Sequence, residues 1–439
     1  MSDPAQSGTR KLLTVLGITF ALAVGVGNTI GAGILRTPGT IATYLPDFWP
    51  FMAVWVIGGA YALLGANALS ELATMVPRSG GQYVFVRRGL GDYAGFVVGW
   101  SDWISTCGTT AAVAIVVGEY TVGLFPELRT HQVVALGVVA IFTVIQWFGV
   151  RWGGAAQTLT SLIKAIVLLL FIAACFALGN RNPTEALFHA DREIPLIAAM
   201  IIALQSVIYT FDGWTAPIYF SEEIKKPEKN LPRAMFGGLA MVIVIYLLLN
   251  VAFATVVPLP TLAGKNLAAA TVAEHIFGIH GDMVMRLVMV LALLSAVNSN
   301  VLMAPRVVFA MSSDRLFWRG ASEVNAGGTP DVALLISSIL AGAFIVTGTF
   351  ENVIAKLAFF FVANYTLSFV SLFVLRRREP ETPRPYRAWG HPLTTGLALL
   401  ASAVFLAAAV AGDTANSLWA IVLLFLSFPA YLMIRSRSR

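Results

Sequence analysis

The chain contains few charged residues. Asp, Glu, Lys and Arg make up 12% of its 439 residues, whereas hydrophobic residues make up 57%. Soluble domains carry about 25% charged residues, so this composition excludes an ordinary soluble protein. Apolar runs of about 20 residues, long enough to cross a bilayer, recur along the whole chain. The sequence therefore predicts an all-α polytopic membrane protein with no separate soluble domain.

Cysteine and histidine are also scarce. Cys107 and Cys175 are the only cysteines, and both fall within apolar runs, so we interpret them as packing residues. The five histidines lack the spacing of a metal site, and we expect neither a metal nor a cofactor. The sequence contains no H-E-x-x-H motif and no G-x-S-x-G nucleophile motif, so we do not expect an enzyme. The first apolar segment is too long for the core of a signal peptide, and we predict none.

The apolar runs predict twelve membrane spans, and an even number places both termini on one side. Lys and Arg are concentrated in the loops of that side, so both termini are predicted to be cytoplasmic, in a plasma or inner membrane. We expect the net charge of +6 to contact membrane lipids rather than nucleic acid. The spans cover approximately residues 12–44, 49–76, 92–123, 132–150, 154–178, 194–220, 233–257, 282–311, 331–349, 352–375, 392–411 and 415–434.

The first span is interrupted between Val24 and Ile34. This segment holds four glycines within nine residues, together with Asn28 and Thr29, and Pro38 follows it. Each glycine in a helix interior costs roughly 1 kcal/mol relative to alanine and exposes the backbone. Exposed backbone is tolerated in a membrane only where protein buries it or where it lines a cavity. We therefore favour a helix broken near mid-membrane over the alternative, a small-residue packing face.

A second interruption falls in the sixth span, within Tyr209–Pro217. Asp212, Gly213 and Pro217 occur together there in an otherwise apolar run. The two interruptions occupy the first span of each of two successive five-span blocks. This is the pattern of an inverted-repeat transporter with a binding site near the midplane.

The predicted organisation follows from this pairing. Residues 12–178 form the first five-helix repeat, and residues 194–375 form the second, inverted repeat. Residues 392–434 add two helices. Residues 1–11 and 435–439 are cytoplasmic tails.

Besides Asp212, the predicted spans contain the ionisable residues Lys164, Asp102 and Arg36. Lys164 is about 15 Å from the cytoplasmic end of span five and should meet a carboxylate, backbone carbonyls or water. The alternative is a fixed cation that only ties helices together. Asp102 lies at a comparable depth, either as the partner of Lys164 or as a separate polar lining residue. Arg36 follows the first break and either faces the outer vestibule or extends to the interface.

The segment Pro77–Tyr83 is glycine-rich and basic. It lacks the phosphate-loop pattern, so we expect a turn that leads into a short cytoplasmic or re-entrant helix. Other charged residues fall near predicted helix ends, where we expect them to be solvated. The residues near helix ends are Glu71, Glu119, Glu222, Glu223 and Arg306. For Glu222 and Glu223, the alternative is that they form salt bridges of a cytoplasmic gate.

Several motifs resemble the amino acid–polyamine–organocation superfamily, and within it the L-type amino acid transporter branch. Ile30–Ile34, with the sequence IGAGI, is similar to the span-one signature. Phe211–Trp214 and Ser221–Ala234 resemble the span-six motif and are the most specific part. Pro77–Tyr83 and Arg384–Arg387 are also similar, and the resemblance covers essentially the whole chain. It implies a LeuT-type fold, with 5+5 inverted repeats, two further C-terminal helices, and helices one and six broken.

The resemblance also implies a substrate site made mostly of backbone. The amides of Gly31–Gly33 would bind the α-carboxylate, because free N–H groups at a helix N-terminus attract anions. Backbone carbonyls near Thr29, Ile30, Tyr209 and Asp212 would bind the α-ammonium. The implied substrate-binding residues are Thr29, Ile30, Gly31, Ala32, Gly33, Tyr209, Thr210, Phe211, Asp212, Gly213, Trp214 and Thr215.

Single positions refine what the resemblance implies. Lys164 resembles the lysine that stands where sodium-coupled members hold a cation, which implies sodium-independent transport. Tyr209 matches the aromatic residue that closes over the substrate. Ala32 replaces the usual serine, and Thr215 replaces an asparagine found in many L-type members. The loop Gly123–His131 has no cysteine, so no disulfide-linked ancillary subunit is expected.

The leading hypothesis is a secondary active transporter of L-amino acids that works by alternating access. Either exchange or proton-coupled uptake is consistent with Lys164. We favour neutral substrates, with a cationic amino acid or polyamine transporter as the second hypothesis because Asp212 supplies a carboxylate. A non-transporting amino acid sensor is the alternative from a different class, but we would expect it to carry an extra signalling domain.

Overall fold

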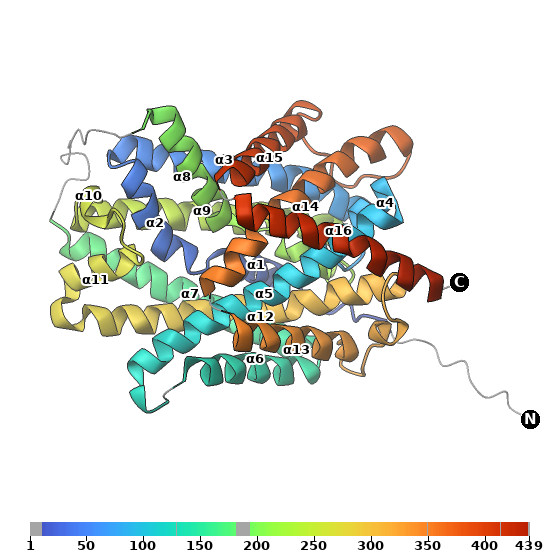
Figure 1. The fold of residues 1–439 in the computed structure, drawn as a ribbon, viewed down its shortest axis with the longest axis horizontal. Helices are drawn as coiled ribbons and strands as arrows, with labels where there is room; N and C mark the ends of the chain where they lie inside the picture. The colour runs from blue at the N-terminus through green and yellow to red at the C-terminus, as the bar shows by residue number, and fades with distance from the viewer. Residues whose placement is uncertain (1–10, 129, 181–193, 349, 413, 438–439) are drawn as a thin grey trace, which may run out of the picture.

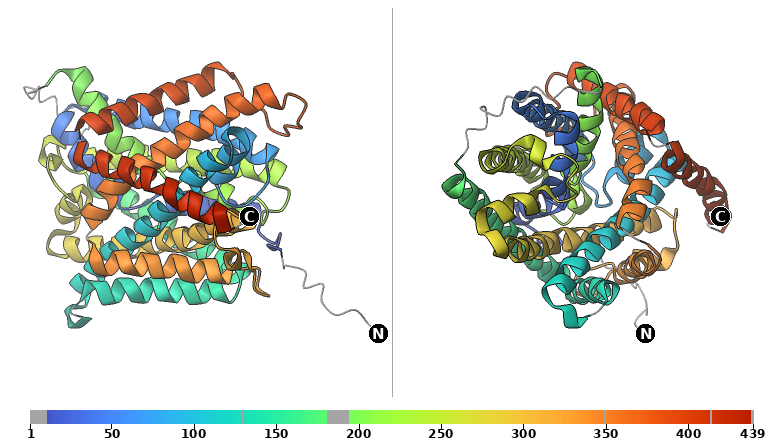
Figure 2. Two further views of the ribbon diagram at one scale, coloured as in Figure 1. Left: turned by 45° about the vertical axis from the view of Figure 1, so that its right-hand side comes forward. Right: turned by 60° about the vertical axis from the view of Figure 1, so that its left-hand side comes forward.

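A computed structural model describes residues 11–128, 130–180, 194–348, 350–412 and 414–437. Long helices run side by side and form a bundle (Figure 1). By length and composition, eight described helices could cross a membrane, and the bent pair α1–α2 makes nine. Two shorter apolar helices, α6 and α13, lie side by side at the edge of the bundle opposite α15 (Figure 2). The prediction of an all-helical polytopic membrane protein is confirmed.

Each predicted span coincides with a helix or with an interrupted pair of elements. Hydropathy marks only the apolar part of a helix, so α7 and α9 begin several residues before their predicted spans. The elements are α1 (Ile18–Thr29) with α2 (Gly33–Tyr44), α3 (Phe48–Met75), α5 (Asp92–Leu124), α6 (His131–Trp147), α7 (Val150–Leu178), α8 (Leu196–Phe211) with η2 (Ala216–Phe220), α9 (Pro227–Val256), α12 (Gly281–Ser313), α13 (Asp331–Thr347), α14 (Phe350–Arg378), α15 (Leu393–Gly412) and α16 (Thr414–Arg437).

Short elements complete the fold. The turn Pro77–Tyr83 leads into α4 (Gln82–Leu90), so the predicted short helix is confirmed. The connection between α9 and α12 contains α10 (Leu259–Leu262) and α11 (Ala268–Phe277). The division into two inverted repeats stays a prediction. Most of the predicted tails, residues 1–10 and 438–439, lies outside the described residues.

The two predicted interruptions meet backbone to backbone. The axes of α1 and α2 differ by 40°, and α8 ends at Phe211, before η2 begins. Gly213 lies in the second break with φ +108°, a conformation that glycine adopts without strain. A Cβ at Gly213 would lie 2.8 Å from the carbonyl carbon of Asn28 and 2.9 Å from the nitrogen of Thr29. Glycine therefore permits the second break to contact the first.

Backbone pairing joins two distant segments at the predicted cytoplasmic end of the bundle. The Leu16 amide donates to the Glu223 carbonyl at 2.9 Å, and the Lys225 amide donates to the Leu16 carbonyl at 2.9 Å. The segment that precedes α1 is thereby joined to the segment that follows η2. Two halves of the interrupted spans thus meet at one end of the molecule.

The expectation that charges near helix ends are solvated is wrong for Glu71, Glu223 and Arg306. The side chains of all three have no exposed surface. Glu119 is exposed and Glu222 is partly exposed, as expected. Segments distant in the sequence cover the three buried side chains, and ion pairs compensate their charge.

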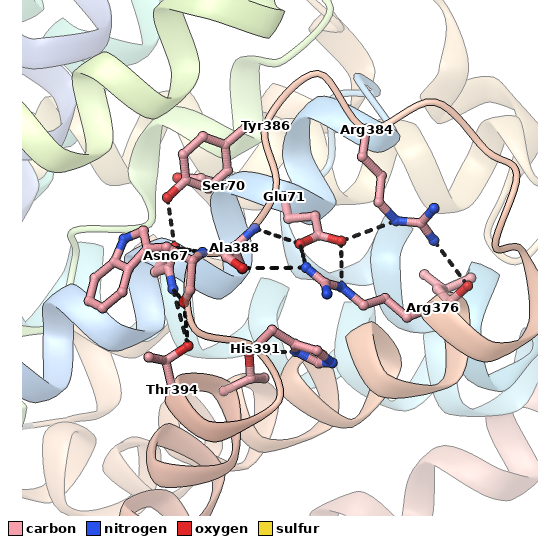
Figure 3. Close-up of polar contacts among 12 residues, drawn as sticks. Asn67, Ser70, Glu71, Arg376, Arg384, Tyr386, Ala388, His391 and Thr394 are labelled. Carbon is pink, nitrogen blue, oxygen red and sulfur yellow. Dashed lines mark hydrogen bonds and ion pairs between the residues drawn. The ribbon is translucent and has the colours of Figure 1, made fainter.

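Glu71 anchors the connection between α14 and α15 to α3 (Figure 3). Arg376 donates to its two carboxylate oxygens at 2.9 and 2.5 Å, and Arg384 Nε lies 3.1 Å from Oε1. The Ala388 amide donates to Oε2 at 2.7 Å. One helical turn earlier, Asn67 Oδ1 accepts hydrogen bonds from this connection, including one of 2.6 Å from the Tyr386 hydroxyl. This loop therefore packs against α3 as a fixed part of the fold.

Candidate functional site

A cavity of about 220 Å³ lies where the two interrupted spans meet. The structure brings most of the predicted site residues to its wall. The predicted residues that line it are Thr29, Gly31, Ala32, Gly33, Arg36, Asp102, Tyr209, Thr210, Asp212, Gly213 and Thr215.

Four predicted residues lie behind this wall. Ile30 and Lys164 are buried beside the first break. The Phe211 ring packs against Tyr246, with centroids 4.9 Å apart, and Trp214 packs against Tyr365 at 5.3 Å. Phe211 and Trp214 therefore support the shape of the cavity rather than forming its surface.

The backbone of Gly31–Gly33 borders the cavity at the start of α2. The first amides of a helix have no partner within it, and the helix dipole favours an anion at that end. A Cβ added at Gly31 would have no atom within 4 Å, so this residue faces open space. A Cβ at Gly33 would lie 3.1 Å from Thr210 Oγ1, so Gly33 packs against α8. This geometry suits a carboxylate.

Lys164 of α7 binds the last turn of α1. Its ammonium donates to the Gly27 carbonyl at 2.7 Å and to the Ile30 carbonyl. Backbone carbonyls, and not Asp102, are thus its partners. A cation is favourable at this C-terminal end of a half-helix. Lys164 fastens α7 to the first break.

Tyr246 of α9 connects the two breaks and was not predicted from the sequence. Its hydroxyl lies 2.8 Å from the Thr29 carbonyl and 3.0 Å from the Thr210 carbonyl. Carbonyls that were expected to bind an ammonium, those of Thr29 and Ile30, therefore already accept hydrogen bonds. A carbonyl oxygen has two lone pairs, so each retains capacity for a second donor.

Two carboxylates line the cavity, one from α5 and one from the second break. Asp212 accepts a hydrogen bond from the Tyr365 hydroxyl of α14. Asp102 of α5 accepts from the Tyr219 hydroxyl of η2, which lies 2.8 and 2.9 Å from its two oxygens. Within the described part of the chain, no ion pair includes either carboxylate. Asp102 is thus a separate lining residue, which resolves one of the alternatives.

Several lining residues were not predicted. Asn300 of α12 donates to Asn28 of α1 at 3.0 Å, across the cavity edge. Spacing alone could have found two others, because Thr106 and Thr109 lie four and seven residues after Asp102, on one helix face. The other lining residues that were not predicted are Thr37, Gln82, Val113, Tyr219, Ala296, Met303, Phe361 and Tyr365.

The described residues contain no group of three or more His, Cys, Asp or Glu side chains that could hold a metal ion. What the cavity offers is a row of backbone amides, two carboxylates and the Arg36 side chain. These groups match a zwitterionic small molecule, which needs an anion site and a cation site close together.

Comparisons with known proteins agree with this chemistry. The sequence profile of the amino acid permease family matches residues 11–428. The chain is 28% identical over 430 residues to the serine/threonine exchanger SteT of Bacillus subtilis, covering 96% of this chain and 97% of the relative. It is 27% identical to the mouse Asc-type amino acid transporter 1, over 85% of this chain and 72% of the relative. It is 24% identical to the human b(0,+)-type amino acid transporter 1, over 86% of this chain and 79% of the relative.

Proposed function

Because the chain belongs to the amino acid permease family, we propose that it is a secondary active transporter of L-amino acids that works by alternating access. It is an integral multi-pass membrane protein, and its relatives are amino acid transporters and exchangers. The observation that carries the proposal is the cavity between two interrupted helices, with the bare backbone of Gly31 facing it. Broken helices at a midplane site are the device by which many transporters bind their substrates.

We propose that the α-carboxylate binds the amides of Gly31, Ala32 and Gly33. The α-ammonium binds on the opposite side, at the carbonyls of the breaks and beside the Asp212 carboxylate. Helix-terminal amides favour the anion, and carbonyls with a carboxylate favour the cation. Tyr209, which lines the cavity, closes over the bound substrate.

Neutral amino acids are the proposed main substrates. The names of two relatives support this, a serine/threonine exchanger and a large neutral amino acids transporter small subunit 2 from human. One observation favours the second candidate, a cationic amino acid or polyamine: two carboxylates, Asp102 and Asp212, line the cavity. A non-transporting sensor would use the same cavity and differs only in that bound substrate does not cross the membrane.

Transport is proposed to be independent of sodium. The Lys164 ammonium already occupies the carbonyls of Gly27 and Ile30 at the end of α1, which could otherwise coordinate a metal cation. Exchange and proton-coupled uptake both remain consistent with this arrangement. We further propose a plasma or inner membrane location with both termini cytoplasmic. Cys107 and Cys175 are both buried, which supports the proposal that no partner subunit is linked by a disulfide.

Uptake into liposomes tests the function. Purified protein is reconstituted in vesicles loaded with one unlabelled L-amino acid, and uptake of each labelled L-amino acid is measured, with its D-enantiomer as the control. Sodium is then replaced by choline, and a pH gradient is applied to separate exchange from proton coupling. Stereoselective uptake without sodium supports the proposal. Saturable binding without uptake by any member of the panel would instead identify a sensor.

A further inference from the structure

One face of α5 presents a row of polar side chains to the cavity. Asp102, Thr106 and Thr109 lie at positions i, i+4 and i+7, and all three line the cavity. Val113, a further turn along, continues the same face as an apolar residue. The substrate backbone groups already have proposed sites at the two breaks. This wall is therefore the surface left for the substrate side chain.

Asp102 is the strongest acceptor on this wall. Its side chain is 3% exposed, and the Tyr219 hydroxyl supplies its hydrogen bond. A carboxylate has about four lone-pair sites, so one hydroxyl leaves most of its acceptor capacity unused. A carboxylate inside the membrane is costly unless it meets a donor or a cation. The cavity is the direction from which a further donor can arrive.

Thr109 provides a second, independent indication on the same wall. Its Oγ1 is buried and has no hydrogen-bond partner within the described part of the chain. The hydroxyl of Thr106, by contrast, donates to the Asp102 carbonyl at 2.7 Å. Buried polar atoms are nearly always paired, so an orphan at a cavity wall indicates a group that the ligand or a water supplies.

We propose that Asp102 and Thr109 form a side-chain subsite that selects L-amino acids whose short side chain ends in a hydrogen-bond donor. Asp102 accepts from the substrate's hydroxyl or amine, and Tyr219 holds the carboxylate in place. An amine binds more tightly than a hydroxyl, because hydrogen bonds between ionised partners are stronger. This inference rests on the proposed function. Among its candidate substrates it favours those with a hydroxyl or an amine in the side chain, and the amine-bearing ones belong to the second, cationic candidate class.

Three amino acids with side chains of equal length test the subsite. Norvaline, homoserine and 2,4-diaminobutyrate end in a methyl, a hydroxyl and an amine, respectively. Each competes against uptake of a labelled substrate by wild-type protein in liposomes. We expect diaminobutyrate to inhibit at the lowest concentration and norvaline to require a concentration at least about tenfold higher, with homoserine between them.

Two variants assign the preference to α5. Asp102→Asn keeps the shape of the side chain and removes its charge. It should reduce the difference between the inhibitory concentrations of diaminobutyrate and norvaline to less than about threefold. Thr109→Val keeps the shape of the side chain and removes the unpaired hydroxyl. It should weaken inhibition by homoserine and leave inhibition by norvaline unchanged. Asp282→Asn is the matched control, because this carboxylate is exposed and pairs with Arg286 at 2.7 Å.

Three results would overturn the proposal. The first is equal inhibition by all three amino acids in the wild type, and the second is an unchanged preference in Asp102→Asn. The third is a preference that disappears in Asp212→Asn but survives in Asp102→Asn. If Asp102→Asn is not monodisperse after purification, the Thr109→Val result alone decides. Failure of the proposed function looks different, because no amino acid would then be taken up by the wild type.

Discussion

Glu223 and Arg306 form an ion pair in which neither side chain has any exposed surface. Arg306 donates to the two carboxylate oxygens at 3.1 and 2.9 Å and to the Leu302 carbonyl at 2.9 Å. Its guanidinium also lies 5.2 Å from the centroid of the Phe220 ring. Glu223 follows η2 and Arg306 belongs to α12, so the pair fastens the second half of the interrupted sixth span to α12. Any movement of η2 away from α12 must separate these charges.

Glu223→Gln should destabilise the protein strongly. Removing one partner of a buried pair leaves an uncompensated charge and typically costs about 3–5 kcal/mol. We expect a large fall in the thermal unfolding midpoint of the purified protein. Glu222→Gln is the control, because its 3.9 Å pair with Arg78 is partly exposed and contributes less than about 1 kcal/mol. The double variant Glu223→Gln/Arg306→Gln should be more stable than Glu223→Gln. Equal midpoints for the two glutamate variants would contradict the argument.

The breaks could be predicted from sequence because their cause is local. A lipid environment forbids unpaired backbone, so glycines in the first span and Asp212–Gly213 in the sixth already signal a cavity. Burial of Glu71 could not be predicted in the same way. It depends on Arg384 and Ala388, more than 300 residues later in the chain, which fold back over α3. Hydropathy measures the residues of one helix and contains no information about what covers it.

The same limit explains which site residues the sequence missed. Tyr219 and Tyr246 sit in apolar runs, where a tyrosine is unremarkable until its hydroxyl is seen to reach a carboxylate or two carbonyls. The depth of Lys164 required a polar partner, but a carboxylate and a backbone carbonyl meet that requirement equally well. Only the arrangement of α7 against α1 decides between them.

Gly31→Val should abolish amino acid binding with little loss of stability. A Cβ at Gly31 meets no atom within 4 Å, so the added side chain enters the cavity without displacing the protein. It then covers the amides that are proposed to bind the α-carboxylate. Binding is measured by the thermal shift that each amino acid produces. Gly137→Val, on α6, is the control because a Cβ there also meets no atom within 4 Å. A normal ligand-induced shift in Gly31→Val would exclude this part of the cavity as the binding site.

Lys164→Met should reduce uptake at least about tenfold, because the Ile30 carbonyl then loses its donor, and a buried carbonyl left unpaired costs about 1–3 kcal/mol. The two affected carbonyls, of Gly27 and Ile30, shape the first break. Uptake is measured per mole of reconstituted protein, so that lower expression is not mistaken for lower activity. Wild-type uptake should be the same in sodium and choline. Full activity of Lys164→Met would mean that the lysine has no role in transport, and dependence of the wild type on sodium would contradict the proposed coupling.

His391 should make the protein less stable as the pH falls. It lies in the connection fastened by Glu71, where its Nδ1 is 3.0 Å from Thr395 Oγ1 (Figure 3). Burial, reinforced by the nearby Arg376, lowers the pKa of His391 below its usual range. The folded state therefore resists protonation, while the unfolded chain takes up a proton below about pH 6.5. The stability that the neutral ring contributes is present above that pH and is lost as the pH decreases.

The His391 effect is isolated by substitution. His391→Gln replaces the imidazole by an amide. The amide can still hydrogen-bond Thr395 but cannot take up a proton. We expect the thermal midpoint of wild-type protein to fall more than that of His391→Gln between about pH 7.5 and 5.5. His280→Gln provides the matched comparison, because this histidine is exposed at the start of α12 and lies outside the connection that Glu71 holds. If wild type and His391→Gln lose stability in parallel, acid lability arises elsewhere, and the fastening of this loop by Glu71 and Arg376 does not include the histidine.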